Sequence, residues 1–419
     1  MREALTGSWA LFLGVALLML GHGLQGSLLG LRATLEGFPT ALTGIVMSAY
    51  FAGFLAGSVL APRAVRRVGH VRVFAALASL VSTAALMHAV FVNPATWVAM
   101  RVLTGVCLAG LYVVAESWLN DRATNETRGQ VLSIYMVIMT GGLGGGQLLL
   151  NLADPAGFEL FILTSALVSL ALVPMLLSAS PAPAFDTPAQ VGIRQLYAMS
   201  PLGVIGCMGT GLSTGAVVGM GAVYAEGIGL SLAQISLFMA MAFLGAVVFQ
   251  WPIGQVSDRF DRRRVLTIVT FLAAAAATAA ALAGAGGWAP FVIMCIFGGL
   301  AFPMYALCIA HTNDFLEPEQ MVAASSGLVF AGGAGAIFGP VTVAATMSIV
   351  GPAGFFWCLA AVHAAIGAFA LWRMTRRPAM PLDEQGTCVI LTRTSAVATA
   401  AAVETALGQM DEEGEGAAG

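Results

Sequence analysis

The sequence contains no lysine, because all 18 of its basic residues are arginine. Without lysine the chain cannot form a Schiff base on a side-chain amine and cannot supply the lysine of a nucleotide-binding P-loop. Charge of either sign is scarce as well, at 9% of residues, against about 25% in an ordinary soluble domain. So few charges cannot cover a water-facing surface, and 58% of the residues are hydrophobic. We therefore expect a protein whose solvent is lipid.

The motifs of the common enzyme and cofactor classes are missing too. The sequence has no Walker A pattern and no His-Glu-x-x-His zinc pattern. Its six cysteines show no metal-ligand spacing, and five of them fall in apolar stretches where cysteine behaves as a small hydrophobe. We expect no cofactor, no metal site, no nucleic-acid partner and no enzymatic activity.

Long apolar runs fill the chain instead, separated by charged or turn-forming residues. A helix needs about 20 predominantly apolar residues to cross a bilayer. The first run follows Arg2 and is too long for the hydrophobic region of a signal peptide, so we read it as a membrane span. Twelve helical spans are predicted, at residues 8–31, 40–61, 73–92, 96–118, 130–152, 159–177, 201–224, 231–256, 264–284, 289–312, 322–349 and 354–372.

The arginines predict the orientation of the spans. If the N-terminus is cytoplasmic, every arginine outside the apolar runs except Arg32 falls on the cytoplasmic side, and Arg101 lies within a span. The opposite orientation would reverse this bias, so the positive-inside rule predicts that both termini are cytoplasmic. The expected location is the inner membrane of the cell, in contact with the lipid bilayer.

The spans divide into two related groups of six. A proline-bearing connection separates them, and the expected units are a bundle at 1–177, a cytoplasmic linker at 178–200, a second bundle at 201–373 and a disordered cytoplasmic tail at 374–419. The two bundles carry matching features in the same order, which is typical of transporters built from repeats. Matching pairs include Asn120-Asp121 with Asn313-Asp314, and Gly142 and Gly146 with Gly335 and Gly339.

At these residues the chain resembles the major facilitator superfamily, from the first span to the twelfth. Span eight ends in Gly254-x-x-x-Asp258-Arg259-x-x-Arg262-Arg263, which is similar to the superfamily's cytoplasmic loop signature. The first-half counterpart departs from it, with Ala61 at the place of the usual Asp. Span four carries a similar fourth-helix motif, Arg101-x-x-x-Gly105. Ala115-Glu116-Ser-Trp-Leu-Asn-Asp121 and the following Thr127-Arg128-Gly129 resemble the YcaD-like branch, which is grouped with multidrug-efflux-type transporters.

The resemblance implies an all-α membrane fold of 12 helices in two pseudo-symmetric bundles that move a solute by alternating access. It also implies a cytoplasmic gate, in which Asp258 braces span eleven when the cytoplasmic side is closed. The residues expected in this gate are Asp258, Arg259, Arg262 and Arg263 in the second half and Glu116 and Arg128 in the first. Topology alone explains basic loops on this side, but it does not explain Asp258.

Polar residues within the spans are the candidates for substrate or proton contact, because they are costly in lipid and usually face a cavity or a partner. Arg101 is the foremost, either as an anchor that senses a proton or an anionic substrate or as a side chain that reaches the outer interface. The remaining candidates are His22, Gln25, Gln147, Asn151, Gln250 and Trp251. Each could equally make an ordinary hydrogen bond between helices. Tyr50, Tyr112, Tyr224 and Tyr305 could stack on a ring, although packing is the commoner role.

The sequence therefore predicts a secondary active transporter of a small organic solute, acting as a monomer. Proton coupling is favoured over sodium coupling because no span is rich in acids. Export of an apolar or aromatic compound is slightly favoured by the branch resemblance, and uptake of a nutrient or vitamin is the alternative. A membrane enzyme or a non-transporting sensor is the rival from another class, but neither a convergent catalytic set nor an added soluble domain is visible.

Overall fold

The computed structural model describes residues 2–122, 127–177, 192–284 and 286–376, together with isolated positions further on. Throughout these ranges the regular structure is helical, as the long apolar runs predict, because a helix satisfies all of its backbone groups within lipid. The prediction of 12 membrane spans is confirmed by 12 helices that are long and apolar enough to cross a bilayer. Most of these helices extend a few residues beyond the predicted apolar runs.

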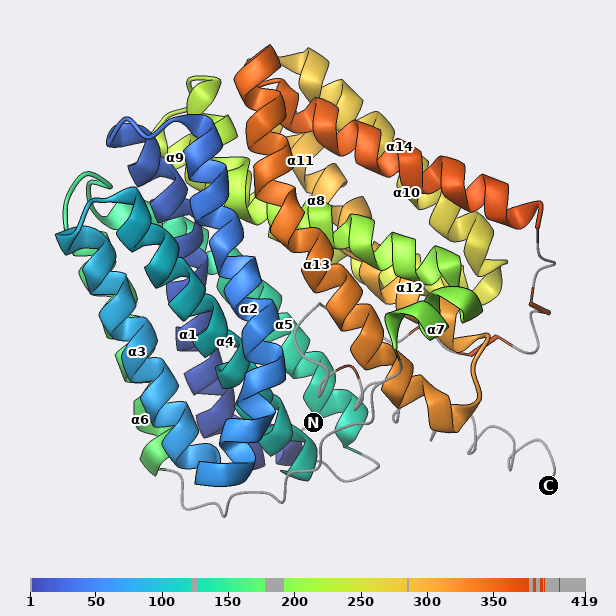
Figure 1. Ribbon diagram of the computed structural model, residues 1–419, viewed down its shortest axis with the longest axis horizontal. Helices are drawn as coiled ribbons and strands as arrows, with labels where there is room; N and C mark the ends of the chain where they lie inside the picture. The colour runs from blue at the N-terminus through green and yellow to red at the C-terminus, as the bar shows by residue number, and fades with distance from the viewer. Residues whose placement is uncertain are drawn as a thin grey trace.

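Six spans form the N-terminal bundle, on the left of Figure 1. Span five ends in a short 3-10 helix, η1. The elements are α1 (Arg2–Leu35), α2 (Thr40–Val68), α3 (His70–Val90), α4 (Pro94–Arg122), α5 (Arg128–Leu148), η1 (Leu149–Leu152) and α6 (Glu159–Leu177).

The other six spans form the C-terminal bundle, on the right of Figure 1. A short helix, α7 (Ile193–Met199), precedes it within the predicted linker, and residues 178–191 of that linker lie outside the described part. The elements are α8 (Pro201–Gly227), α9 (Leu232–Arg259), α10 (Arg262–Ala283), α11 (Ala289–Ala301), α12 (Met304–Asn313), α13 (Pro318–Val350) and α14 (Gly354–Met374).

The tenth span is broken, which the sequence prediction missed. It was predicted as one helix, but α11 and α12 are separated at Phe302 and Pro303. Proline has no backbone N–H and its ring clashes with the preceding turn, so it interrupts a helix. The broken ends remain connected, because Phe302 N–H donates to Gly298 O at 3.1 Å and Tyr305 N–H donates to Phe302 O at 3.3 Å.

Matching glycines allow close helix packing inside each bundle, at equivalent positions of the repeat. In the N-terminal bundle a Cβ at Gly146 would strike the backbone of Leu20 on α1. In the C-terminal bundle a Cβ at Gly339 would strike the backbone of Leu212 on α8. Small residues let helices approach this closely, and dispersion contacts then replace the hydrophobic effect that lipid does not supply. The glycine repeat read from the sequence is thus a repeat in packing.

The two bundles contact each other towards one face, which we call the sealed face. Here Gly44 at the start of α2 meets Pro340 and Ala344 of α13, and Gly30 of α1 meets Val223 of α8. Asn151 in η1 donates from Nδ2 to Ser236 Oγ on α9 at 2.7 Å. The ribbons converge at the top of Figure 1 and diverge below.

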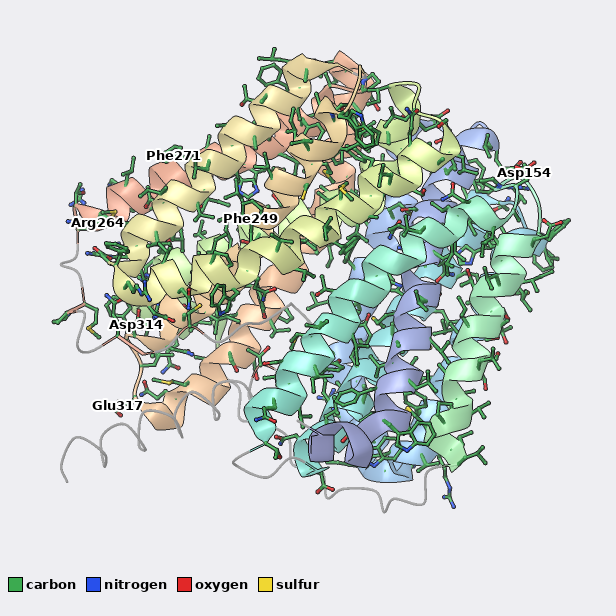
Figure 2. The ribbon with its side chains drawn as sticks, turned by 180° about the vertical axis from the view of Figure 1, so that it is seen from behind. Asp154, Phe249, Arg264, Phe271, Asp314 and Glu317 are labelled. Atoms are coloured by element: carbon green, nitrogen blue, oxygen red, sulfur yellow. The ribbon has the colours of Figure 1, made fainter. Side chains whose placement is uncertain are left out.

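We call the opposite face, where α9 ends and α10 begins, the arginine face. Figure 2 shows Arg264, Asp314 and Glu317 at this end of the C-terminal bundle and Asp154 at the other end of the molecule.

Candidate substrate-binding site

A cavity of about 130 Å³ lies between the two bundles. Helices α1, α2, α4 and α5 line it from one side, and α8, α9 and α12 from the other. Rings dominate its wall, at His22, Tyr50, Phe51, Phe54, Tyr112, Phe243, Phe302 and Tyr305. Aromatic faces and edges of this kind favour offset or edge-to-face contact with another ring.

The polar groups on the wall carry no fixed charge. Besides the tyrosine hydroxyls and His22 they are Thr140, Thr210, Thr214 and Gln250. No Asp, Glu or Arg of the described residues lines the cavity. An apolar wall with a few polar groups is the usual character of a small-molecule site.

The polar candidates named from the sequence divide into three groups. His22 and Gln250 line the cavity. Gln25 and Gln147 are buried outside its lining, and Gln147 is held between helices, because it accepts from Ser27 Oγ and donates from Nε2 to Gly23 O at 3.0 Å. Asn151 and Trp251 lie elsewhere, Asn151 at the sealed face and Trp251 with 60% of its surface exposed on α9.

Arg101 lies behind the cavity wall and is 1% exposed. Its guanidinium carbon is 4.6 Å from the centre of the Tyr50 ring, a cation–π contact. The hydroxyl of Tyr50 in turn lies 3.2 Å from His22 Nε2. Tyr50 and His22 both line the cavity, so they connect the buried charge to the site. The alternative in which Arg101 extends to the outer interface is inconsistent with this burial.

Several wall residues were missed from the sequence, among them Phe302, which lies at the break in span ten. Pro303 was the available signal for that break. Three of the four tyrosines considered for stacking line the wall, whereas Tyr224 packs on Phe355 with ring centroids 4.9 Å apart.

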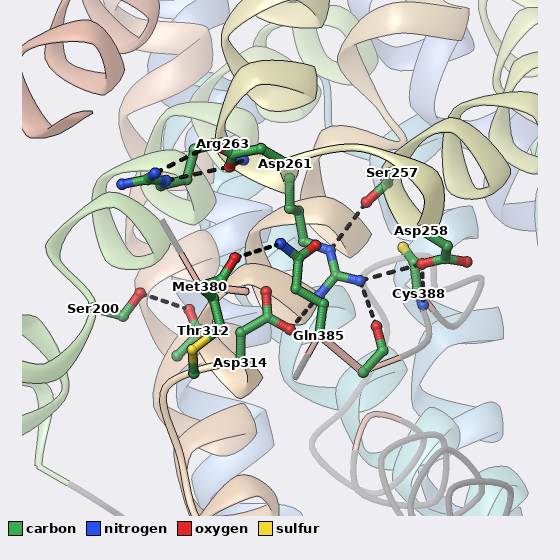
Figure 3. Close-up of polar contacts among 12 residues, drawn as sticks. Ser200, Ser257, Asp258, Asp261, Arg263, Thr312, Asp314, Met380, Gln385 and Cys388 are labelled. Atoms are coloured by element: carbon green, nitrogen blue, oxygen red, sulfur yellow. Dashed lines mark hydrogen bonds and ion pairs between the residues drawn. The ribbon is translucent and has the colours of Figure 1, made fainter. Parts of the chain in front are cut away.

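A second polar cluster lies at the arginine face and includes Ser257, Asp258 and Asp314 (Figure 3). The side chain of Arg262 contacts all three. Arg262 donates to Ser257 Oγ at 3.0 Å, to Asp258 Oδ1 at 3.2 Å and to Asp314 Oδ1 at 2.5 Å. It also donates to the backbone carbonyl of Gly386 at 2.5 Å, and the N–H of Cys388 donates to Asp258 Oδ1 at 2.8 Å. The cluster therefore joins three helices to two positions of the tail. The rest of the tail beyond Arg376, apart from a few isolated positions, lies outside the described residues.

The expected gate residues are brought together only in part. Arg262 binds Asp258 as expected, but Arg263 instead binds Asp261, the N-cap of α10, at 3.2 Å. Arg259 is exposed. In the first half, Glu116 accepts a hydrogen bond from the Tyr135 hydroxyl at 2.8 Å. The Arg128 side chain lies outside the described part of the structure, so its expected contact with Glu116 stays a prediction.

The helix expected to receive Asp258 needs correction. The sequence interpretation had Asp258 bracing span eleven, which is α13. Across the bundle interface, however, α9 packs on α5, whereas α13 packs on α2. Under the repeat, α2 corresponds to α9 and α5 corresponds to α13, so the α2–α13 contact of one side matches the α9–α5 contact of the other. A brace from the end of α9 would therefore contact span five.

Asp314, one residue beyond the tenth span, gives the arginine face a pH dependence. Burial raises the pKa of Asp314 from its usual 3.8 to about 6, although Arg262 opposes the shift. Since the folded pKa is the higher one, stability is fully present below about pH 4 and is lost as pH rises through about 6. The loss between those values is about 3 kcal/mol, at about 1.4 kcal/mol per pKa unit.

We therefore expect Asp314→Asn, which cannot ionise, to become more stable relative to the wild type as the pH rises. Unfolding midpoints of both proteins, measured between pH 4.5 and 7.5 in one detergent, test this. A constant difference between the two proteins across that range would contradict it. Glu317→Gln, at an exposed position nearby, is the control and is expected to show a constant difference.

Two six-helix bundles around a shared cavity define a polytopic membrane transporter. The chain belongs to the Major Facilitator Superfamily, whose family model matches residues 11–220 and 202–402. The expected fold and transporter class are thereby confirmed, and the chain is not an enzyme.

Known relatives agree with this assignment. The chain is 29% identical over 341 residues to the MFS-type transporter YcaD of Escherichia fergusonii, covering 80% of this chain and 87% of the relative. It is 27% identical over 337 residues to YcaD of Escherichia coli K12, with coverage of 80% and 87%. The expected YcaD-like branch is thus confirmed.

Solved structures of low sequence identity share the fold. The nucleoside transporter NupG superimposes with a TM-score of 0.75 at 13% identity, over 90% of this chain and all of the other. The D-xylose-proton symporter superimposes with a TM-score of 0.68 at 14% identity, over 87% and 97%.

Proposed function

We propose that this protein is a secondary active transporter that carries a small organic solute through the central cavity by alternating access. The observation that carries the proposal is a cavity lined by both bundles. The described contacts between the two bundles lie at the level of this cavity and from there towards the sealed face. Rocking one bundle against the other about such a site would expose it to each side in turn.

The arginine distribution supports the orientation we propose. Arg66, Arg67 and Arg264 are exposed at the arginine face. By the positive-inside rule this face is cytoplasmic, with both chain termini on that side of the inner membrane. The sealed face is then extracytoplasmic, and the conformation described is inward-facing.

Proton coupling and export are the finer parts of the proposal. Glu116 on α4 is a buried acid, and its hydrogen bond to Tyr135 lies within the N-terminal bundle. His22 is the titratable group with a neutral-range reference pKa on the cavity wall. Export of an aromatic solute agrees with the ring-lined wall, and uptake of a nutrient or vitamin remains the alternative.

Transport in proteoliposomes tests the proposal. Under an imposed pH gradient, the wild type is expected to move a member of a panel of small aromatic compounds together with a counterflow or coflow of protons. Gln250→Leu removes a hydrogen-bonding group from the wall, and a loss of about tenfold or more in the transport rate is expected. Gln255→Leu, the same change at an exposed position of α9, is the control and should transport normally.

Two results would contradict the proposal. If no compound moves and no proton flux appears in either direction, the transporter assignment fails for this cavity. If the two glutamine variants transport equally well, the solute does not depend on the wall between the bundles.

A further inference from the structure

The side chain of Arg101 is a buried charge without a counter-charge. Its Nε and Nη1 atoms have no hydrogen-bond partner among the described residues, and none of the ion pairs of the described part includes it. Its recorded cation–π contact is with the ring of Tyr50. A guanidinium carries five donors in a fixed fork that matches a carboxylate, and here two of its three nitrogens have no acceptor among the described residues.

The polar atoms between Arg101 and the cavity do not supply the missing acceptor. Tyr50 contacts Arg101 through its ring, and its hydroxyl lies beside His22. His22 Nδ1 and Gln25 Nε2, both on α1, are also buried without a partner in the described structure. The unsatisfied nitrogens of Arg101 and Gln25 are donors, and no ion pair among the described residues brings a carboxylate to Arg101.

An unpaired buried cation is unfavourable in a protein and more so within a bilayer. A bound anion would remove that cost each time the site fills. Among the described residues, Arg101 is the one cation next to the cavity that lacks an ion-pair partner, and no described Asp, Glu or Arg lines the wall. The site is therefore matched to a single negative charge on an otherwise apolar body.

We propose that the transported solute is an aromatic monocarboxylate whose carboxylate binds Arg101 while its ring lies among the rings of the cavity wall. The proposal rests on the transporter function above and narrows its substrate class. To admit the carboxylate, the Tyr50 ring must turn away from the guanidinium or share it. Tyr50 and His22 therefore lie on the path from the cavity to the Arg101 side chain.

Matched acids and amides test the charge requirement. The purified protein is titrated calorimetrically with benzoate and 2-naphthoate, and separately with benzamide and 2-naphthamide, which keep the ring and lose the charge. We expect the acids to bind the wild type about tenfold or more tightly than the amides, the ratio that a charge-assisted hydrogen bond supplies. Arg101→Met should abolish this preference. Arg67→Met, at an exposed position, is the control and should retain it.

The empty protein provides a second measurement. If Arg101 serves a ligand rather than the fold, Arg101→Met removes an uncompensated charge and should raise the unfolding midpoint of the ligand-free protein. A structural role predicts a lower midpoint. Should Arg101→Met fail to accumulate, Arg101→Lys keeps the charge without the planar fork, and its acid preference should fall below that of the wild type.

The proposal is overturned if no acid binds, if the amides bind the wild type as tightly as the acids, or if Arg101→Met keeps the preference. It is also overturned if Arg101→Met lowers the midpoint of the empty protein. Binding and transport of the amides alone would leave the central cavity as the transport site and would reject only the anionic substrate class, so the two proposals fail separately.

Discussion

Joining η1 to α9 at the sealed face is expected to stop transport. The side chains of Asn151 and Ser236 are in hydrogen-bond contact across the bundle interface, at 2.7 Å. Asn151→Cys together with Ser236→Cys therefore places two thiols at facing positions across the interface, where oxidation is expected to join them in a disulfide. Alternating access requires this contact to open, and a covalent bond prevents that. Transport after oxidation should fall by about a hundredfold and return after reduction, as measured in proteoliposomes.

The control is a disulfide that does not cross the interface. Ser82 and Ser165 lie within the N-terminal bundle, with their hydroxyl oxygens 2.7 Å apart. Ser82→Cys with Ser165→Cys should form a disulfide equally well and leave transport unchanged, because both residues move with one body. Both pairs are made after the native cysteines have been replaced. Undiminished transport by the fully oxidised Asn151 and Ser236 pair would show that the sealed face does not open.

The second large effect is expected at the crossing of α2 and α4. A Cβ at Gly105 would overlap the carbonyl oxygen of Tyr50 and the backbone of Phe54, and a Cβ at Gly53 would overlap Val102. Because the obstacle is backbone and cannot turn aside, Gly105→Val must push the helices apart. Overpacking costs about 1–3 kcal/mol where side chains can adjust, and we expect at least the upper value here.

We therefore expect little or no monodisperse Gly105→Val protein on size-exclusion chromatography, together with a lowered unfolding midpoint for whatever is recovered. Gly141→Val is the control, because a Cβ at Gly141 meets nothing within 4 Å, and its yield should match the wild type. Equal yields for the two variants would mean that the helices can separate at little cost. Tyr50 and Phe54 line the cavity, so the surviving protein should also bind solute more weakly.

The fold was predictable from the sequence to a larger extent than the site. The number of spans follows from hydropathy, and the glycine repeat marks which helices must pack closely against a neighbour. The side of each helix that faces the cavity does not follow. Gln250 and Trp251 are neighbours in sequence but lie about 100° apart around a helix. One lines the cavity and the other is 60% exposed. In lipid both faces of a span are apolar, so no polar face reveals its rotation.

Contacts between distant segments were also beyond reach. Asp314 was recognised only as part of the Asn-Asp repeat, and nothing in the sequence pairs it with Arg262 rather than with another of the arginines. The same holds for Gly386 and Cys388, whose backbone groups bind Arg262 and Asp258. Backbone partners leave no residue-type signal. Arg101, by contrast, could be named as a candidate because a charge within an apolar run is itself the signal.

The sealed face differs chemically from the arginine face. Gly44, Ala344, Asn151 and Ser236 close it through small side chains and one neutral hydrogen bond, and no ion pair between described residues crosses the interface there. Salt screens interactions between charges and has little effect on contacts between neutral groups. In the proposed orientation, changes of ionic strength or pH outside the cell would therefore leave the outer closure unchanged, while the same changes in the cytoplasm would act on the Arg262 cluster. Ionic strength would thus act on the Arg262 cluster and not on the contacts that close the outer side.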